Sequence, residues 1–138
     1  MSTSATGHCL CGGITFSAKL LHNHIDACHC TMCQHWSGGP FIGVECAAGD
    51  LALTGEDKIT LYPSSEWAER AFCSQCGSHL FYRFKPTGQF GIPLGLLDSQ
   101  DGLQFTQQIF VDQKSSCYEF ANKTKEMTGA EVIAEFGG

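Results

Sequence analysis

The sequence predicts an all-β domain, and three observations support this fold class. Short stretches in which apolar and polar residues alternate recur along the chain, which is typical of strands with one buried face. Sixteen glycines and ten phenylalanines among 138 residues indicate many turns between short, aromatic-rich strands. Signals for helices are few. A chain of this length normally forms one domain, so we expect residues 1–138 to be a single folded unit.

The expected strands follow one another from the N-terminal region to residue 111. Residues 13–18 alternate apolar and polar side chains, and residues 58–62 do the same until Pro63 ends the pattern. Glycine, proline and aspartate punctuate the chain between the expected strands. The other expected strands are residues 40–46, 69–73, 79–84, 90–96 and 103–111, and the turn signals lie at residues 38–40, 48–50, 86–88 and 99–102.

Three short helical segments are expected beside these strands. Thr128 and Glu131 have the spacing of a capping box, and the apolar residues that follow them have helical spacing. Ser116 and Glu119 have the same capping spacing, and residues 31–37 have room for one helical turn.

Composition and charge exclude several classes of partner. The formal net charge is -6 and the eight basic residues are dispersed, so the chain lacks the basic surface that nucleic-acid binding needs. No apolar run is long enough to cross a membrane. The N-terminal segment lacks the basic and apolar regions of a signal peptide, so we expect a cytoplasmic protein in a reducing environment.

Two pairs of cysteines predict a closed metal site. Cys9 and Cys11 form one pair, Cys73 and Cys76 form the other, and a glycine follows the second cysteine of each pair. Glycine adopts the positive φ that a metal-binding turn often needs, and four thiolates satisfy tetrahedral zinc. The alternatives are free buried cysteines or disulfides, although an odd total of nine cysteines disfavours a disulfide framework.

The third cluster predicts a metal site with a vacant position. Cys28, Cys30 and Cys33 supply three thiols, and a zinc ion with three protein ligands can accept a water molecule or a substrate. His29, His35 or Cys46 could instead supply a fourth ligand and close the site. His35, shortly after Cys33, is also a candidate for proton transfer.

The cysteine clusters, together with their neighbours, resemble the glutathione-dependent formaldehyde-activating enzyme family, which includes the centromere protein V group. The resemblance extends over roughly residues 7–121. The segments that carry it are residues 7–13, 27–33, 72–77, 95–98 and 109–111.

The resemblance implies a β-tent fold of antiparallel sheets and two zinc ions. It implies a structural zinc at the four paired cysteines and a catalytic zinc at Cys28, Cys30 and Cys33. The implied activity is that of a carbon–sulfur lyase acting on a thiol adduct, for example formaldehyde and glutathione giving S-hydroxymethylglutathione. Cys117 stands where many relatives have tryptophan, and the chain is shorter than the glutathione-specific members. These two departures leave the substrate open.

Two other functions are compatible with the same residues. A zinc-stabilised protein-binding module would use both metals structurally and would have four protein ligands at each site. A redox or zinc-buffering protein would use Cys46 and Cys117 as additional thiols. The number of protein ligands at the second site distinguishes the enzyme from the binding module.

Overall fold

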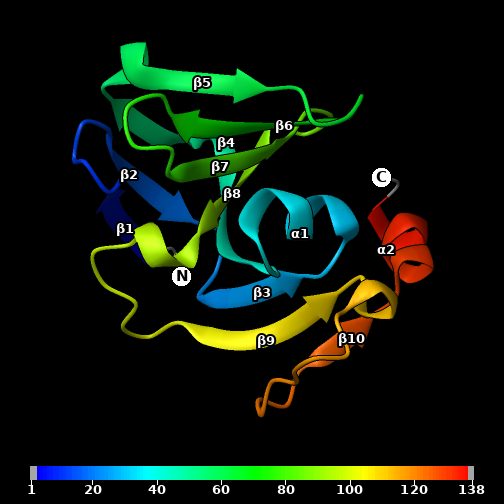
Figure 1. The fold of residues 1–138 in the computed structure, drawn as a ribbon. Coiled ribbons are helices and arrows are strands. Elements are labelled where there is room, and N and C mark those ends of the chain that lie inside the picture. Colours follow the sequence, from blue (N-terminus) through cyan, green and yellow to red (C-terminus); the bar gives the residue numbers. More distant parts are fainter. Residues whose placement is uncertain (1–2, 137–138) are drawn as a thin grey trace. The chain divides into compact units, whose positions relative to one another are not determined.

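The computed structural model describes residues 3–136, and strands make up most of its regular structure (Figure 1). The all-β prediction is therefore confirmed, with two short helices added to the strands. Within the described residues, the contacts divide the chain into two compact units: residues 3–23 with 43–102, and residues 24–42 with 103–136. The single domain expected for residues 1–138 stays a prediction, and residues 1–2 and 137–138 lie outside the described part.

The first unit contains antiparallel strands in the order β1-β2-β4-β8-β7-β6-β5. Alternation in β2 matches the sequence prediction, because Phe16, Ala18 and Leu20 are buried while the residues between them are exposed. The bounds are β1 Thr3–His8, β2 Thr15–Leu20, β4 Phe41–Thr54, β5 Ile59–Tyr62, β6 Ala68–Cys73, β7 His79–Phe84 and β8 Gln89–Pro93, with short 3₁₀ turns at Glu56–Lys58 and Leu94–Leu96.

Strand β4 is longer than expected, because the turn predicted at residues 48–50 does not end it. On the β2 side, Ala18 pairs with Leu51 whereas Leu20 pairs with Cys46, so several β4 residues bulge out opposite one residue of β2. The glycine and aspartate of this segment therefore form an irregularity within a strand, and the same strand continues to pair beyond it.

The second unit is built on three parallel strands, β10, β9 and β3, with β9 in the middle. The resemblance implied antiparallel sheets. The strand pairs of the first unit given above are antiparallel, as implied, whereas these strands of the second unit pair in parallel. Phe110 follows β9 with a left-handed φ of 55°, which ends the strand before residue 111. The bounds are β3 His24–Cys28, α1 Thr31–Ser37, β9 Gln104–Ile109, the 3₁₀ turn Val111–Gln113, β10 Lys125–Met127 and α2 Gly129–Phe136.

The helix predictions have mixed outcomes. Helix α1 occupies residues 31–37 as expected, and the Thr128–Glu131 capping box is present: the Glu131 N–H donates to Thr128 Oγ1 and the Thr128 N–H donates to Glu131 Oε1, at 3.2 and 2.9 Å. The helix expected at residues 116–119 is wrong, since residues 116–117 form a turn and residues 118–119 have no regular structure. No helix in the described range 3–136 is long and apolar enough to cross a bilayer.

Thr128→Ala should loosen the start of α2. Removing the cap should lower the free energy of unfolding by about 1 kcal/mol, measured by chemical denaturation. The Thr128 backbone N–H lowers the pKa of Glu131, so the contribution of this carboxylate is present at neutral pH. It should be lost as the pH falls below the ordinary range of glutamate. Thr128→Ala should reduce this pH dependence, because the Thr128 hydroxyl also lowers the pKa of Glu131. Thr60→Ala, at an exposed threonine of β5, should leave the pH dependence unchanged, and an identical pH profile in both variants would contradict the assignment.

Candidate metal centres

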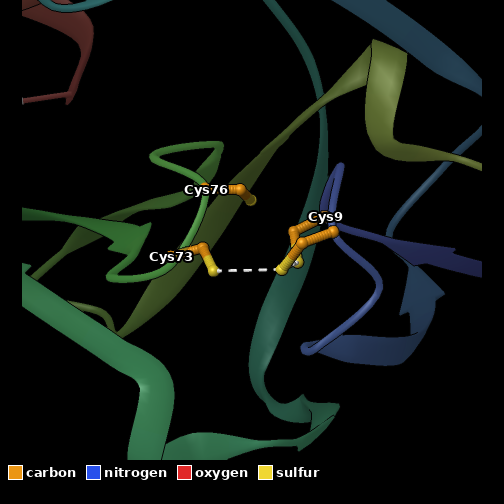
Figure 2. Close-up of side chains that lie close together, drawn as sticks. Cys9, Cys73 and Cys76 are labelled. Atoms are coloured by element: carbon orange, nitrogen blue, oxygen red, sulfur yellow. Dashed lines mark hydrogen bonds between the residues drawn. The ribbon is translucent and has the colours of Figure 1, made fainter.

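The structure brings the four paired cysteines of the first unit together. Cys9 and Cys11 lie in the turn after β1, and Cys73 and Cys76 lie at the end of β6 and in the turn after it. Figure 2 shows Cys73 and Cys76 facing Cys9 from the opposite turn. All four Sγ atoms lie within 4.8 Å of one another. Residues more than 60 positions apart in sequence thus form one cluster.

The two turns have the backbone geometry expected of metal-binding knuckles. Gly12 and Gly77, which follow the second cysteine of each pair, have φ values of 75° and 77°. This left-handed conformation is unfavourable for residues with a Cβ, so the predicted role of these glycines is confirmed. Backbone N–H groups also point at the sulfurs, because Ile14 donates to Cys9 Sγ and Gly13 donates to Cys11 Sγ, each at 3.4 Å.

Ser78 connects the two turns. Its Oγ accepts a hydrogen bond from the Leu10 N–H at 3.0 Å and lies 3.2 Å from Cys76 Sγ, to which the hydroxyl donates. The Ser78 hydroxyl is the largest cause that lowers the pKa of Cys76 to about 5, followed by the backbone N–H groups of Ser78 and Cys11. The Cys76 sulfur is therefore favoured as a thiolate, which is the form that binds metal.

Cys11, the exposed thiol of the first cluster, lies close to the other sulfurs. The Gly13 N–H favours the Cys11 thiolate, but the Cys9 thiol, burial and the sulfurs of the second turn outweigh it and raise the pKa of Cys11 to about 11. Four sulfurs this close cannot all ionise without a compensating cation. A divalent metal would supply that charge.

Distances between the sulfurs fit zinc. Cys11 Sγ lies 3.6 Å from Cys9 Sγ and 3.8 Å from Cys73 Sγ. Zinc–sulfur bonds of about 2.3 Å in a tetrahedron place the sulfurs about 3.8 Å apart. The donor set and its spacing therefore fit a closed four-thiolate zinc site.

Ser78→Ala should weaken metal binding at the first cluster. The variant removes both the hydrogen bond to Cys76 Sγ and the link to Leu10, and partners that orient metal ligands typically contribute about 10- to 100-fold in affinity. Competition with a chromophoric chelator would measure the change. Ser74→Ala, at an exposed serine of the same turn, is the matched control and should leave the affinity unchanged. Equal affinities for the two variants would contradict a role for Ser78.

The three cysteines of the remaining cluster lie together in the second unit. Cys28 ends β3, Cys30 is the N-cap of α1, and Cys33 is buried in the first turn of that helix. Their Sγ atoms all lie within 4.8 Å of one another. The Cys33 N–H donates to Cys30 Sγ at 3.4 Å, so the capping geometry of α1 itself fixes one of the three sulfurs.

The three thiols of this cluster also need a cation if all of them are to ionise. Hydrogen bonds with the Cys30 and Cys33 thiols, and then burial, raise the pKa of Cys28 well above its ordinary value. A metal ion would replace the shared protons and allow all three thiolates to form. Among the described residues, no other histidine, cysteine, aspartate or glutamate completes this group.

The residues considered as a fourth ligand lie elsewhere. His35 is exposed on α1 two positions after Cys33, which places the two on different faces of the helix. Cys46 is buried in β4 of the first unit, where burial raises its pKa to about 11. His29 is fully buried and hydrogen-bonds to Gln108 and Tyr118. None of the three belongs to the sulfur group.

Sequence reasoning missed the polar residues that support the two clusters. Ser78 lies two residues after Cys76 in the sequence, and this short separation could have indicated that its hydroxyl contacts the Cys76 sulfur. Gln108 is a buried polar residue in a strand of mostly half-buried residues, and its register opposite Ala27 is set by long-range pairing. Tyr118 lies in an irregular segment with no periodicity to indicate its direction.

Comparison with known proteins identifies the family. A family model described as glutathione-dependent formaldehyde-activating enzyme matches residues 4–113. The chain belongs to this family. A protein of Schizosaccharomyces pombe named as an uncharacterized lyase is 32% identical over 128 residues, which cover 92% of this chain and 93% of that protein. Membership of the glutathione-dependent formaldehyde-activating enzyme family indicates an enzyme.

Longer relatives and a solved structure agree with this assignment. A Talaromyces marneffei protein named for glutathione-dependent formaldehyde activation is 31% identical over 126 residues, covering 89% of this chain and 65% of that protein. The crystal structure of a Rhodobacter sphaeroides protein matches with a TM-score of 0.61 and 22% identity, covering 73% of this chain and 99% of that chain. The structural likeness supports the fold.

Proposed function

We propose that this chain catalyses the reversible formation and cleavage of a carbon–sulfur bond in a small thiol adduct, at the cluster of Cys28, Cys30 and Cys33. The observation that carries the proposal is the group of three sulfurs, to which no other potential ligand of the described residues belongs. A zinc ion bound there would supply a Lewis-acidic position open to an external thiol.

Glutathione and formaldehyde are the proposed substrates, supported by the family name and by the names of the relatives. In the synthetic direction, the glutathione sulfur bonds to the carbonyl carbon of formaldehyde, the carbonyl double bond becomes single, and the thiol proton ends on the new hydroxyl. The three cysteines would hold the zinc ion, which would supply the position that brings the reacting thiol beside the aldehyde. His35, exposed on the helix that carries Cys33, is the proposed group for proton transfer.

The first cluster has a structural role in this proposal. Cys9, Cys11, Cys73 and Cys76 would enclose a second zinc ion completely, and a closed four-thiolate site leaves no position for substrate. The chain would thus bind two zinc ions, one of them structural and one catalytic.

The cytoplasm is the proposed location. None of the nine cysteines forms a disulfide. Seven reduced thiols in two metal-binding clusters fit a compartment in which glutathione keeps cysteines reduced.

Cobalt substitution tests the proposed function. In protein loaded with two Co²⁺ ions, glutathione should change the absorption of the cobalt at the second cluster and leave the absorption of the first unchanged. The same protein should convert formaldehyde and glutathione to the adduct. A cobalt spectrum that glutathione leaves unchanged, with two metals bound, would contradict an enzyme of this type.

A zinc-stabilised protein-binding module is the second candidate. It is favoured by Leu61 and Tyr62, which are more than half exposed on β5, the end strand of the first unit's sheet. X-ray absorption spectroscopy of the zinc protein distinguishes the candidates. Four protein ligands at each metal support a module, whereas three thiolates with an exchangeable ligand at the second metal support an enzyme.

A further inference from the structure

A fully buried histidine lies between two of the cysteines of the second cluster. His29 has no exposed surface, whereas Cys28 and Cys30 on either side of it are partly exposed. Side chains alternate in extended backbone, so the two thiols lie on one side of the chain and the imidazole on the other. Buried polar side chains need hydrogen-bond partners, and those of His29 are specific.

Both ring nitrogens of His29 are hydrogen-bonded. Nε2 donates to Gln108 Oε1 at 2.8 Å, and the Tyr118 hydroxyl donates to Nδ1 at 3.4 Å. The Gln108 amide is itself oriented, because its Nε2 donates to Thr124 Oγ1 at 3.0 Å. The carboxamide oxygen can only accept, so this arrangement puts a ring proton of His29 on Nε2.

The backbone of His29 is held as well. Its N–H donates to the Ile109 carbonyl at 3.0 Å, and its carbonyl accepts from Gln34 Nε2 at 2.6 Å. The rings of Tyr118 and Phe120 pack beside the imidazole, with centroids at 6.4 and 6.0 Å. The residue between two proposed metal ligands is thus fixed through both its backbone and its side chain.

We propose that Gln108 and Tyr118 are positioning residues, which hold His29 and through it set the Cys28 and Cys30 sulfurs at the spacing that a metal ion requires. The proposal rests on the metal site of the proposed function. A chelate fixed before binding loses less conformational freedom when the metal arrives, and this raises affinity. The polar pair would therefore act on the second cluster alone.

The test measures metal affinity in the full chain without any thiol substrate. Tyr118→Phe removes one hydroxyl and keeps the ring, and Gln108→Met removes the acceptor and keeps a similar volume. Each variant should weaken Co²⁺ binding at the second cluster by about 10- to 100-fold, measured by chelator competition. The thiolate-to-cobalt absorption of that cluster should also change. Gln104→Met, at an exposed glutamine of the same strand, is the matched control and should bind like the unmodified protein.

The first cluster serves as the internal reference. Its affinity should stay within twofold in every variant. Unchanged affinity at the second cluster in Tyr118→Phe and Gln108→Met would overturn the proposal, and so would equal weakening at both clusters, which would indicate general destabilisation. If Gln108→Met does not fold, Tyr118→Phe decides alone. Because no glutathione is present, these outcomes are independent of whether the protein reacts with thiols.

Discussion

Cys73→Ser should prevent the protein from folding stably. Cys73 is fully buried at the end of β6, and its sulfur lies 3.8 Å from that of Cys11 on the other turn. Structural zinc contributes about 10 to 16 kcal/mol of apparent binding free energy in small domains, whereas whole domains are stable by only about 5 to 15 kcal/mol. Losing the proposed zinc ion should therefore remove most of the stability of the first unit. Circular dichroism during heating and metal analysis of the purified protein would measure the effect.

Cys46→Ser is the control for Cys73→Ser, because it also buries a serine hydroxyl but should not remove a metal ligand. Cys46 is also fully buried in the first unit, and it belongs to neither sulfur cluster. Its replacement should cost about 1 to 3 kcal/mol for the unpaired hydroxyl and leave both metals bound. If Cys73→Ser melts at the same temperature as Cys46→Ser and retains two metals, the first cluster does not hold the fold.

The local chemistry of the site was predictable because it depends on neighbouring residues. The spacing of the cysteines and the glycines after Cys11 and Cys76 fixed the expected knuckles, and Gly12 and Gly77 adopt the positive φ values that this requires. The three-sulfur cluster was predictable for the same reason, since a strand end and one helical turn place Cys28, Cys30 and Cys33 together.

Features that depend on distant residues were not predictable. The strand expected at residues 103–111 ends at Ile109, because Phe110 turns into a left-handed conformation before the 3₁₀ turn. Strand β10 has three residues and forms only by parallel pairing to β9, so no periodicity indicated it. The same long-range pairing places Gln108 next to His29, and the sequence around either residue gives no sign of the other.

Cys30→Ser should abolish the proposed activity and leave the fold intact. Cys30 is the N-cap of α1 and its sulfur accepts the Cys33 N–H, and serine is among the best N-cap residues. The serine hydroxyl can thus keep the helix cap but cannot supply a thiolate. Metal analysis should show one zinc instead of two, with the melting transition of the first unit preserved. The rate of adduct formation should fall by about 100-fold or more, because the variant loses the metal that would stabilise the transition state. Each 1.4 kcal/mol of lost transition-state stabilisation lowers the rate about tenfold.

Two further variants show which property of Cys30 matters. Cys30→Ala removes both the cap and the ligand, so it should lose the same activity and an additional ~1 kcal/mol of stability. Cys117→Ser removes an exposed thiol outside both clusters, and it should keep two zincs and full activity. The order expected for stability is therefore serine above alanine at position 30, with both equally inactive. Activity that survives in Cys30→Ser would place the reaction outside the three-sulfur cluster, because a serine hydroxyl at neutral pH is a poor zinc ligand.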